Sequence, residues 1–291
     1  MAWLQLHYPT DQAQAEFVEE LMLGLGAYSV SLTDSADEPI FEPPPGTTPL
    51  WRQVTITALF AADINQEALL LEIAQQMGGL PADLVFEPLA EQAWERAWMA
   101  DFHPMQFGER LWIVPSWTEP PEPNAVNLHL DPGLAFGTGT HETTALCLTW
   151  LEGLDLQGKT VLDYGSGSGV LAIAALLLGA EAAFACDIDP QALLATRENA
   201  KLNGVSERLF CMPPEELPAR QYEVVVANIL AEPLVNLADH ILGFCAPNAH
   251  LGLSGILLDQ AEMVRDAYSG KTHLEPNTTM GEWVLVHGRR K

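Results

Sequence analysis

One of several stretches that could bind a cofactor in this 291-residue chain begins at Asp163. Gly165, Gly167 and Gly169 follow it at every second position, in a D-x-G-x-G-x-G pattern. Glycines at such a turn let a ligand approach the backbone closely. Apolar runs flank the pattern, so we expect a strand, a glycine-rich loop and a helix that opens near Ser168.

Two classes of cofactor compete for this loop. Gly167-Ser-Gly169-Val-Leu-Ala172 matches the G-x-G-x-x-A fingerprint of dinucleotide-binding proteins, and Asp187 follows at the distance expected of a ribose-binding acid. The loop carries no Lys or Arg, however, and Asp163 would place a carboxylate close to a pyrophosphate. The sulfonium and ammonium groups of S-adenosylmethionine are attracted by such a carboxylate. Charge therefore favours the methyl donor over a dinucleotide.

Polar residues also close two further apolar runs. Asp187 follows one of them, and Asp189-Pro190 then opens a helix with a capping residue and a proline. Both aspartates could be caps; we favour Asp189 as the cap and Asp187 as the acceptor for the ribose hydroxyls. Asn228 closes the other run. It is either a helix cap or an amide whose oxygen faces the reacting methyl group.

A glycine-rich segment, DPGLAFGTGTHETT, occupies residues 131–144. Its three glycines and the apolar Phe136 favour a mobile lid over the cofactor. Thr140 is a candidate cap for the following helix, which would place Thr144 in the first turn with its hydroxyl available to the methionine part of the donor. His141 has no acidic or nucleophilic partner near it in the sequence, so a structural role is favoured.

The elements that must position these residues fall into two groups. Residues 1–88 predict strand, helix, strand, strand, helix and strand, an order typical of a ferredoxin-like α+β domain. Alternating apolar residues mark strands over 3–8 and 54–60. The first helix, within 11–25, should bury Phe17, Val18, Leu21 and Leu25, and Asp63 should cap the second, which ends at Gly78. Shorter strands are expected over 29–34 and 83–87.

The pattern changes along the rest of the chain. Residues 89–124 predict a linker helix over 89–101 and a connecting segment that includes a strand over 111–114. From residue 125, short apolar runs at 161–162, 182–186, 224–227 and 251–253 alternate with helical stretches. Apolar strands between helices are typical of a parallel sheet covered on both faces. We therefore expect a doubly wound α/β domain over 125–291.

Charge and composition exclude several classes of protein. The chain has 39 acidic and 13 basic residues, a net charge of −26, which disfavours nucleic acid as the main partner. Residues 1–88 alone hold thirteen acids and one arginine, which indicates either solubility or a basic protein partner. No apolar run is long enough to span a membrane, and no secretory signal is expected. The four cysteines form no C-x-x-C pair, so we expect free buried thiols, no metal site and a cytoplasmic location.

These motifs together carry a resemblance. The segments DPGLAFGTGTHETT, LDYGSGSGVLAIAA, CDIDPQAL and VVVANILAEPL, with WERAWMADFHPMQFG before them, resemble the bacterial ribosomal protein L11 methyltransferase family. The resemblance implies a ferredoxin-like substrate-recognition domain before a Rossmann-like class I methyltransferase domain, with S-adenosylmethionine as donor. It implies as acceptors the lysine ε-amines and the N-terminal α-amine of ribosomal protein L11, methylated up to the trimethyl state. The family's donor-contacting positions fall on Thr144, Gly165, Asp187 and Asn228; Ser166 stands where relatives commonly carry Cys.

Methyl transfer to nitrogen needs alignment and a neutral amine more than a protein nucleophile. We expect Asn228 and nearby carbonyls to orient the amine lone pair, and we identify no dedicated base. Three other interpretations stay open: a small-molecule methyltransferase that uses residues 1–88 as a lid or dimerisation unit, a nicotinamide-dependent oxidoreductase, and a non-catalytic interaction protein. We expect a monomer.

Overall fold

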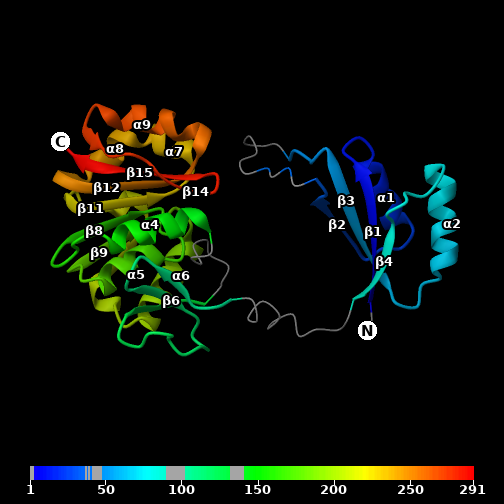
Figure 1. Cartoon of the computed structure of the whole chain (residues 1–291), viewed down its shortest axis with the longest axis horizontal. Coiled ribbons are helices and arrows are strands. Elements are labelled where there is room, and N and C mark those ends of the chain that lie inside the picture. Colours follow the sequence, from blue (N-terminus) through cyan, green and yellow to red (C-terminus); the bar gives the residue numbers. More distant parts are fainter. Residues whose placement is uncertain (1–2, 37, 39, 41–47, 90–101, 132–140) are drawn as a thin grey trace. The chain divides into compact units, whose positions relative to one another are not determined.

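The computed structural model divides the chain into two compact units, Met1–Trp98 and Met99–Lys291 (Figure 1). It describes residues 3–36, 38, 40, 48–89, 102–131 and 141–291. The expected helix over 89–101 and the glycine-rich residues 132–140 lie almost wholly outside this part. Within the part that the structure describes, no helix is both long and apolar enough to cross a bilayer.

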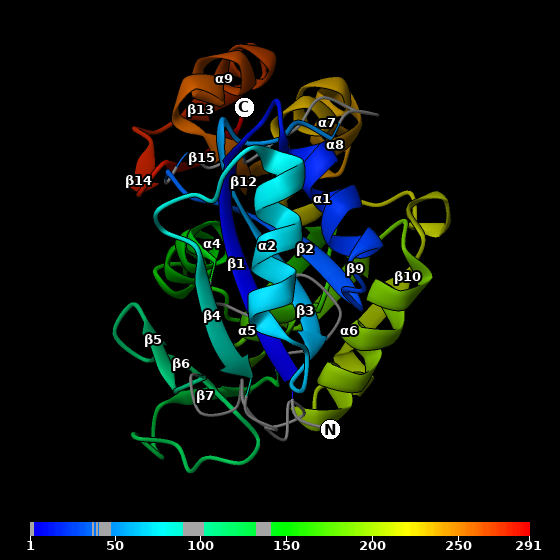
Figure 2. The ribbon, with the colours of Figure 1, turned by 90° about the vertical axis from the view of Figure 1, so that its right-hand side faces the viewer.

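The N-terminal unit is a four-stranded antiparallel sheet with two helices on one of its faces (Figure 2). Its elements follow the predicted order: β1 (Trp3–Asp11), α1 (Ala15–Gly24), β2 (Ser29–Asp34), β3 (Gln53–Ala61), α2 (Gln66–Met77) and β4 (Val85–Leu89). The strands lie in the order β2-β3-β1-β4. Each helix therefore connects two strands that are separated in the sheet by a third.

Alternation in the sequence correctly identifies the core of this unit. Leu6 and Tyr8 of β1 are buried against the helices, as are Ile56 and Phe60 of β3. The prediction for α1 was partly wrong: the helix begins at residue 15 and buries Ala15, Val18 and Met22, whereas Phe17 is 51% exposed.

The cap expected for α2 was also wrong, by two residues. Asn65, not Asp63, is the N-cap, and its side chain accepts a hydrogen bond from the Ala68 N–H at 3.0 Å. Both residues are good caps, so the start of the helix selects between them. Gly78 ends the helix in the left-handed conformation, as predicted.

The C-terminal unit contains an eight-stranded sheet and a smaller sheet. The smaller sheet comprises β5 (Met105–Phe107), β6 (Leu111–Val114) and β7 (Val126–His129). Strands β10, β9, β8, β11, β12, β15 and β13 follow one another across the large sheet, and β14 pairs with β15. The large-sheet strands are β8 (Thr160–Tyr164), β9 (Ala182–Cys186), β10 (Leu209–Met212), β11 (Tyr222–Asn228), β12 (Cys245–Leu257), β13 (Thr272–Leu274), β14 (Thr278–Met280) and β15 (Trp283–Arg290).

Helices cover both faces of the large sheet, as the apolar strands predict (Figure 1). One face packs against α4 (Glu142–Glu152), α5 (Val170–Leu177) and α6 (Pro190–Leu202), and the other against α7 (Ala231–Asn236), α8 (Ala238–Gly243) and α9 (Ala261–Ser269). Short 3₁₀ turns lie at Ser206–Arg208, Pro214–Glu216 and Leu258–Gln260.

The sheet is not wholly parallel, which corrects the sequence-based expectation. Strands β10, β9, β8, β11 and β12 are parallel, whereas β13 and β14 both run antiparallel to β15, as β12 does. Only a tight turn separates Met280 from Trp283, and a connection that short joins antiparallel strands.

The strand order reverses direction around β8, which is what positions the site. From β8 the chain builds outward through β9 and β10 on one side, then returns to place β11 and β12 on the other. In open α/β sheets, ligands bind outside the carboxyl ends of the strands at such a reversal. The segments after β8, β9 and β11 therefore converge on one crevice.

Candidate functional site

The glycine-rich loop after β8 has a backbone that only glycine adopts easily. Gly165, Gly167 and Gly169 have φ angles of 81°, 54° and 78°. A Cβ on Gly165 would lie 2.3 Å from Cγ2 of Ile229, the residue after β11. The loop is therefore pressed against the end of the neighbouring strand, and α5 begins directly after Gly169.

Asp163 at the end of β8 is a wholly buried carboxyl group. Its Oδ2 accepts a hydrogen bond from the Ala172 N–H at 3.1 Å, while its Oδ1 has no partner among the described residues. Burial raises the pKa of Asp163 to about 7, with a smaller contribution from the negative charge of Asp187. Such a group takes up its negative charge most readily when a cation is brought to the free oxygen.

Asp187 directly follows β9, and its carboxylate organises two turns. One oxygen accepts from the Gly167 N–H and the other from the Asp189 N–H, both at 2.9 Å. Asp189 caps α6 through the Gln191 N–H, as the sequence predicts. Each Asp187 oxygen has a second lone pair, so the carboxylate can still accept from the hydroxyls of a ribose.

Thr144 and Asn228 lie together although 84 residues separate them. Thr144 is buried in the first turn of α4, and its Oγ1 lies 3.4 Å from the Asn228 Nδ2 donor at the end of β11. The Asn228 Oδ1 is buried and has no partner among the described residues. This second unpartnered oxygen lies on the strand beside Asp163, whose strand pairs with β11.

The cap of α4 differs from the predicted one. His141, not Thr140, is the N-cap, and its Nδ1 accepts from the Thr143 N–H at 3.3 Å. The His141 ring also packs edge-to-face on Trp283, with 4.8 Å between ring centroids. This agrees with the structural role expected of His141; Thr140 lies outside the described residues.

Sequence reasoning missed a polar stripe on α6 that holds the loop from behind. Thr196 Oγ1 donates to the Gly167 carbonyl at 3.0 Å, and Asn199 Nδ2 donates to the Ser168 carbonyl at 2.9 Å. Asn203 Nδ2 donates to the His129 carbonyl at the end of β7 at 2.7 Å. These three polar residues are spaced by three and four positions, which places them on one helix face. That spacing could have identified the stripe from the sequence.

Ile188 was also missed. It lies between Asp187 and Asp189 with 88% of its surface exposed. An isoleucine this exposed, next to the carboxylate of Asp187, offers an apolar surface on which a flat ring can pack.

The site as a whole fits a cationic ligand better than an anionic one. The Oδ1 atoms of Asp163 and Asn228 are acceptors that lack donors among the described residues, and the loop contains no Lys or Arg. An ammonium group supplies the donors and the positive charge that these oxygens lack, whereas a pyrophosphate supplies neither. Among the described residues there is also no cluster of three or more metal-ligating side chains.

The cysteine thiols form no disulfide, although the Cys186 carbonyl accepts hydrogen bonds from the Gly165 and Ser166 N–H groups of the loop, at 2.8 and 3.0 Å. All four are free: Cys147, Cys186 and Cys245 are buried, whereas Cys211 is half-buried rather than fully buried as expected. Burial raises the pKa of each thiol, so they stay protonated near neutral pH.

Comparison with known proteins adds an independent finding. Residues 2–291 match the family model described as Ribosomal protein L11 methyltransferase (PrmA). The chain is 54% identical to a ribosomal protein L11 methyltransferase of Hahella chejuensis and 55% identical to one of Pseudomonas aeruginosa, covering 100% of this chain and 99% of each relative. A solved structure of a ribosomal protein L11 methylase from Lactobacillus delbrueckii subsp. bulgaricus is similar with a TM-score of 0.60 at 32% identity, covering 65% of this chain and 100% of that one.

Proposed function

Because the chain belongs to the ribosomal protein L11 methyltransferase family, we propose that it transfers methyl groups from S-adenosylmethionine to amines of ribosomal protein L11. The acceptors are lysine ε-amines and the N-terminal α-amine, methylated up to the trimethyl state. The observation that carries this proposal is the pair of buried, unpartnered oxygens on Asp163 and Asn228 beside a glycine-rich loop that contains no cation.

The proposed donor site uses residues from four segments: the start of α4, the loop after β8, the turn after β9, and Asn228 at the end of β11. Thr144 and Asp163 lie where they can receive the amino-acid end, with the ammonium group donating to the free Asp163 oxygen. Gly165 allows the donor to approach the backbone, and Asp187 accepts from the two ribose hydroxyls. The side chain of Ile188, which is exposed, would provide an apolar surface for the adenine ring. When bound, S-adenosylmethionine supplies a methyl group already activated by its sulfonium.

Asn228 is proposed to orient the acceptor amine. A lysine amine has a pKa of about 10.4 in water and is almost fully protonated at pH 7, so it must lose a proton before it reacts. Desolvation near the buried end of β11 lowers the pKa of that amine. The Asn228 Oδ1 then accepts a hydrogen bond from the neutral amine and aims its lone pair at the methyl group. The released proton passes to water, because no dedicated base is needed between successive transfers.

The N-terminal residues 1–88 are proposed to be a ferredoxin-like module that recognises the protein substrate. Support comes from the strand order β2-β3-β1-β4 and from the thirteen acids against one arginine, since an acidic module attracts a basic ribosomal protein. Residues 89–124 connect it to the catalytic residues 125–291, and their strands β5 and β6 belong to the same compact unit as those residues. We also propose a monomer in the cytoplasm, where free thiols such as these stay reduced.

Intact-mass spectrometry tests this function. Ribosomal proteins extracted from cells that lack the enzyme are incubated with purified full-length protein and isotopically labelled S-adenosylmethionine. We expect one basic protein to gain mass in successive methyl increments. Transfer to small amines without transfer to any protein would instead indicate a small-molecule methyltransferase. Absence of both transfer and donor binding would contradict the proposal.

Removing residues 1–88 separates the two kinds of methyltransferase. We expect the truncated chain to keep its affinity for the donor and to lose transfer to L11. If residues 1–88 serve instead as a lid or dimerisation unit of a small-molecule enzyme, transfer to a free small acceptor survives the deletion.

A further inference from the structure

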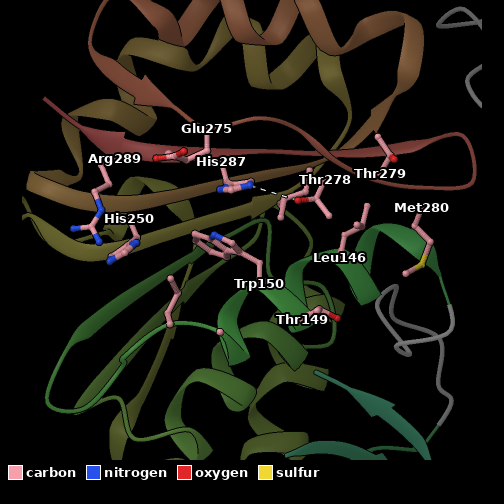
Figure 3. A pocket seen from close by; sticks show the side chains of 14 residues that line it. Leu146, Thr149, Trp150, His250, Glu275, Thr278, Thr279, Met280, His287 and Arg289 are labelled. Carbon is pink, nitrogen blue, oxygen red and sulfur yellow. Dashed lines mark hydrogen bonds between the residues drawn. The ribbon is translucent and has the colours of Figure 1, made fainter. Parts of the chain in front are cut away.

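A second cavity lies away from the donor site, against the face of the large sheet that α4 covers. It has a volume of about 480 Å³, within the range of small-molecule sites (Figure 3). Its floor is the indole of Trp150, which lies so close to Gly252 of β12 that a Cβ there would be 2.6 Å from the ring. None of Thr144, Asp163, Asp187 and Asn228 lines this cavity.

Two charged side chains line the cavity without a protein partner. The guanidinium group of Arg289 in β15 makes no hydrogen bond, ion pair or ring contact with any described residue, whereas the side chain of every other described arginine makes at least one. The Glu275 carboxylate likewise has no partner within the described part of the chain; only its backbone groups are bonded, to His287 and Arg265. In Figure 3, Arg289 and Glu275 lie toward the same end of the cavity.

The two histidines of the cavity do not add charge. Burial, reinforced by Arg289 and Lys159, lowers the pKa of His250, and burial lowers the pKa of His287 despite the nearby Glu275. Both rings are therefore neutral at pH 7, when the cavity holds one fixed positive charge and one fixed negative charge. The His287 and Trp150 rings, with centroids 6.5 Å apart and planes inclined by 49°, form an aromatic wall beside them.

We propose that this cavity binds a free α-amino acid with an aromatic side chain. The carboxylate of such a ligand pairs with Arg289, its ammonium group pairs with Glu275, and its ring lies along Trp150. A simple anion would be repelled by Glu275, and a simple cation would be repelled by Arg289. A zwitterion is therefore the ligand that matches both charges. This site is separate from methyl transfer and does not depend on the proposed function.

Three probes that share a phenyl ring test the proposal by calorimetry on the full chain. They are L-phenylalanine, 3-phenylpropionate, which lacks the ammonium group, and 2-phenylethylamine, which lacks the carboxylate. We expect L-phenylalanine to bind best and each of the others to bind about three- to tenfold more weakly, as for the loss of one partly exposed charged hydrogen bond.

Two variants test which side chain binds each charged group of the ligand. Arg289→Gln should reduce the affinity for L-phenylalanine and should not reduce the affinity for 2-phenylethylamine, which no longer meets a like charge. Glu275→Gln should reduce the affinity for L-phenylalanine and should not reduce the affinity for 3-phenylpropionate. Arg290→Gln is the matched control, because it removes the same charge from the opposite face of β15. Equal binding of the three probes, no binding of L-phenylalanine at millimolar concentration, or an equal effect of Arg290→Gln would each overturn the proposal.

Discussion

Replacing Asp163 with asparagine is expected to change two properties of the protein in opposite directions: the free protein becomes more stable near pH 8, and donor binding becomes weaker. Burial raises the pKa of this carboxyl group from 3.8 to about 7. Folding at pH 8 therefore includes the cost of keeping an ionised carboxylate away from water, and asparagine has no such charge.

The magnitude follows from the pKa. At about 1.36 kcal/mol per pKa unit, the difference between 3.8 and about 7 corresponds to a cost of about 4 kcal/mol. Asparagine can keep the bond from the Ala172 N–H through its carbonyl, but its NH₂ group replaces an oxygen that has no partner among the described residues, at a cost of about 1–3 kcal/mol. We therefore expect a net gain of about 1–3 kcal/mol.

The dependence on pH has a definite sign. Below pH 3.8 the carboxyl group is protonated in both the folded and the unfolded chain, so it adds no penalty. As the pH rises from about 4 to 7 the unfolded chain ionises first, and the folded wild-type protein loses stability. Above about pH 7 the penalty is constant. The advantage of Asp163→Asn should therefore grow between pH 5 and 7 and then level off.

Urea denaturation at pH 5, 6, 7 and 8 measures the stability of both proteins, and calorimetry measures donor affinity. We expect Asp163→Asn to weaken S-adenosylmethionine binding at least about tenfold, because a buried charge-assisted hydrogen bond is lost. At pH 7 the wild type should release about half a proton on binding, since the carboxyl group is then about half protonated. A variant with wild-type affinity, or one whose stability relative to wild type does not change between pH 5 and 8, would refute the reasoning.

Further predictions concern the residues around this carboxyl group. Asn228→Ala should lower kcat on the order of 10²-fold, because the amine is no longer oriented. Wild-type steady-state kinetics would reject that role. Gly165→Ala should destabilise the protein by at least about 1 kcal/mol more than Gly204→Ala and abolish donor binding. Both glycines have positive φ, but only a Cβ at Gly165 would meet Ile229, at 2.3 Å. Equal melting temperatures of the two variants would contradict this. Asp187→Asn should weaken donor binding about tenfold and leave kcat unchanged at saturating donor, because a hydrogen bond from the ribose to a charged carboxylate is lost. An unaltered donor affinity in calorimetry would count against a ribose contact.

Local patterns were enough to predict most strands and the convergence of the site. The strand over 29–34 has the predicted bounds, and the apolar run 182–186 coincides with β9. Thr144 and Asn228 were assigned to one site by the family resemblance, and the structure places their side chains 3.4 Å apart.

Features that depend on the exact start of a helix or on distant neighbours could not be predicted. Asp63 and Asn65 are equally good caps in isolation, so only the packing of α2 selects Asn65. Phe17 fits a helical stripe, but the sheet covers a different face of α1. The spacing of Thr196, Asn199 and Asn203 indicates a polar helix face, but the His129 backbone groups that Asn203 bonds lie 74 residues away and cannot be identified from that spacing.

Paired calorimetric titrations with S-adenosylmethionine and with NADH test the central claim most directly. The account predicts that the cationic thioether binds to the full-length protein and releases protons at pH 7, while the anionic dinucleotide produces no heat of binding. Tight NADH binding with no response to S-adenosylmethionine would contradict the account.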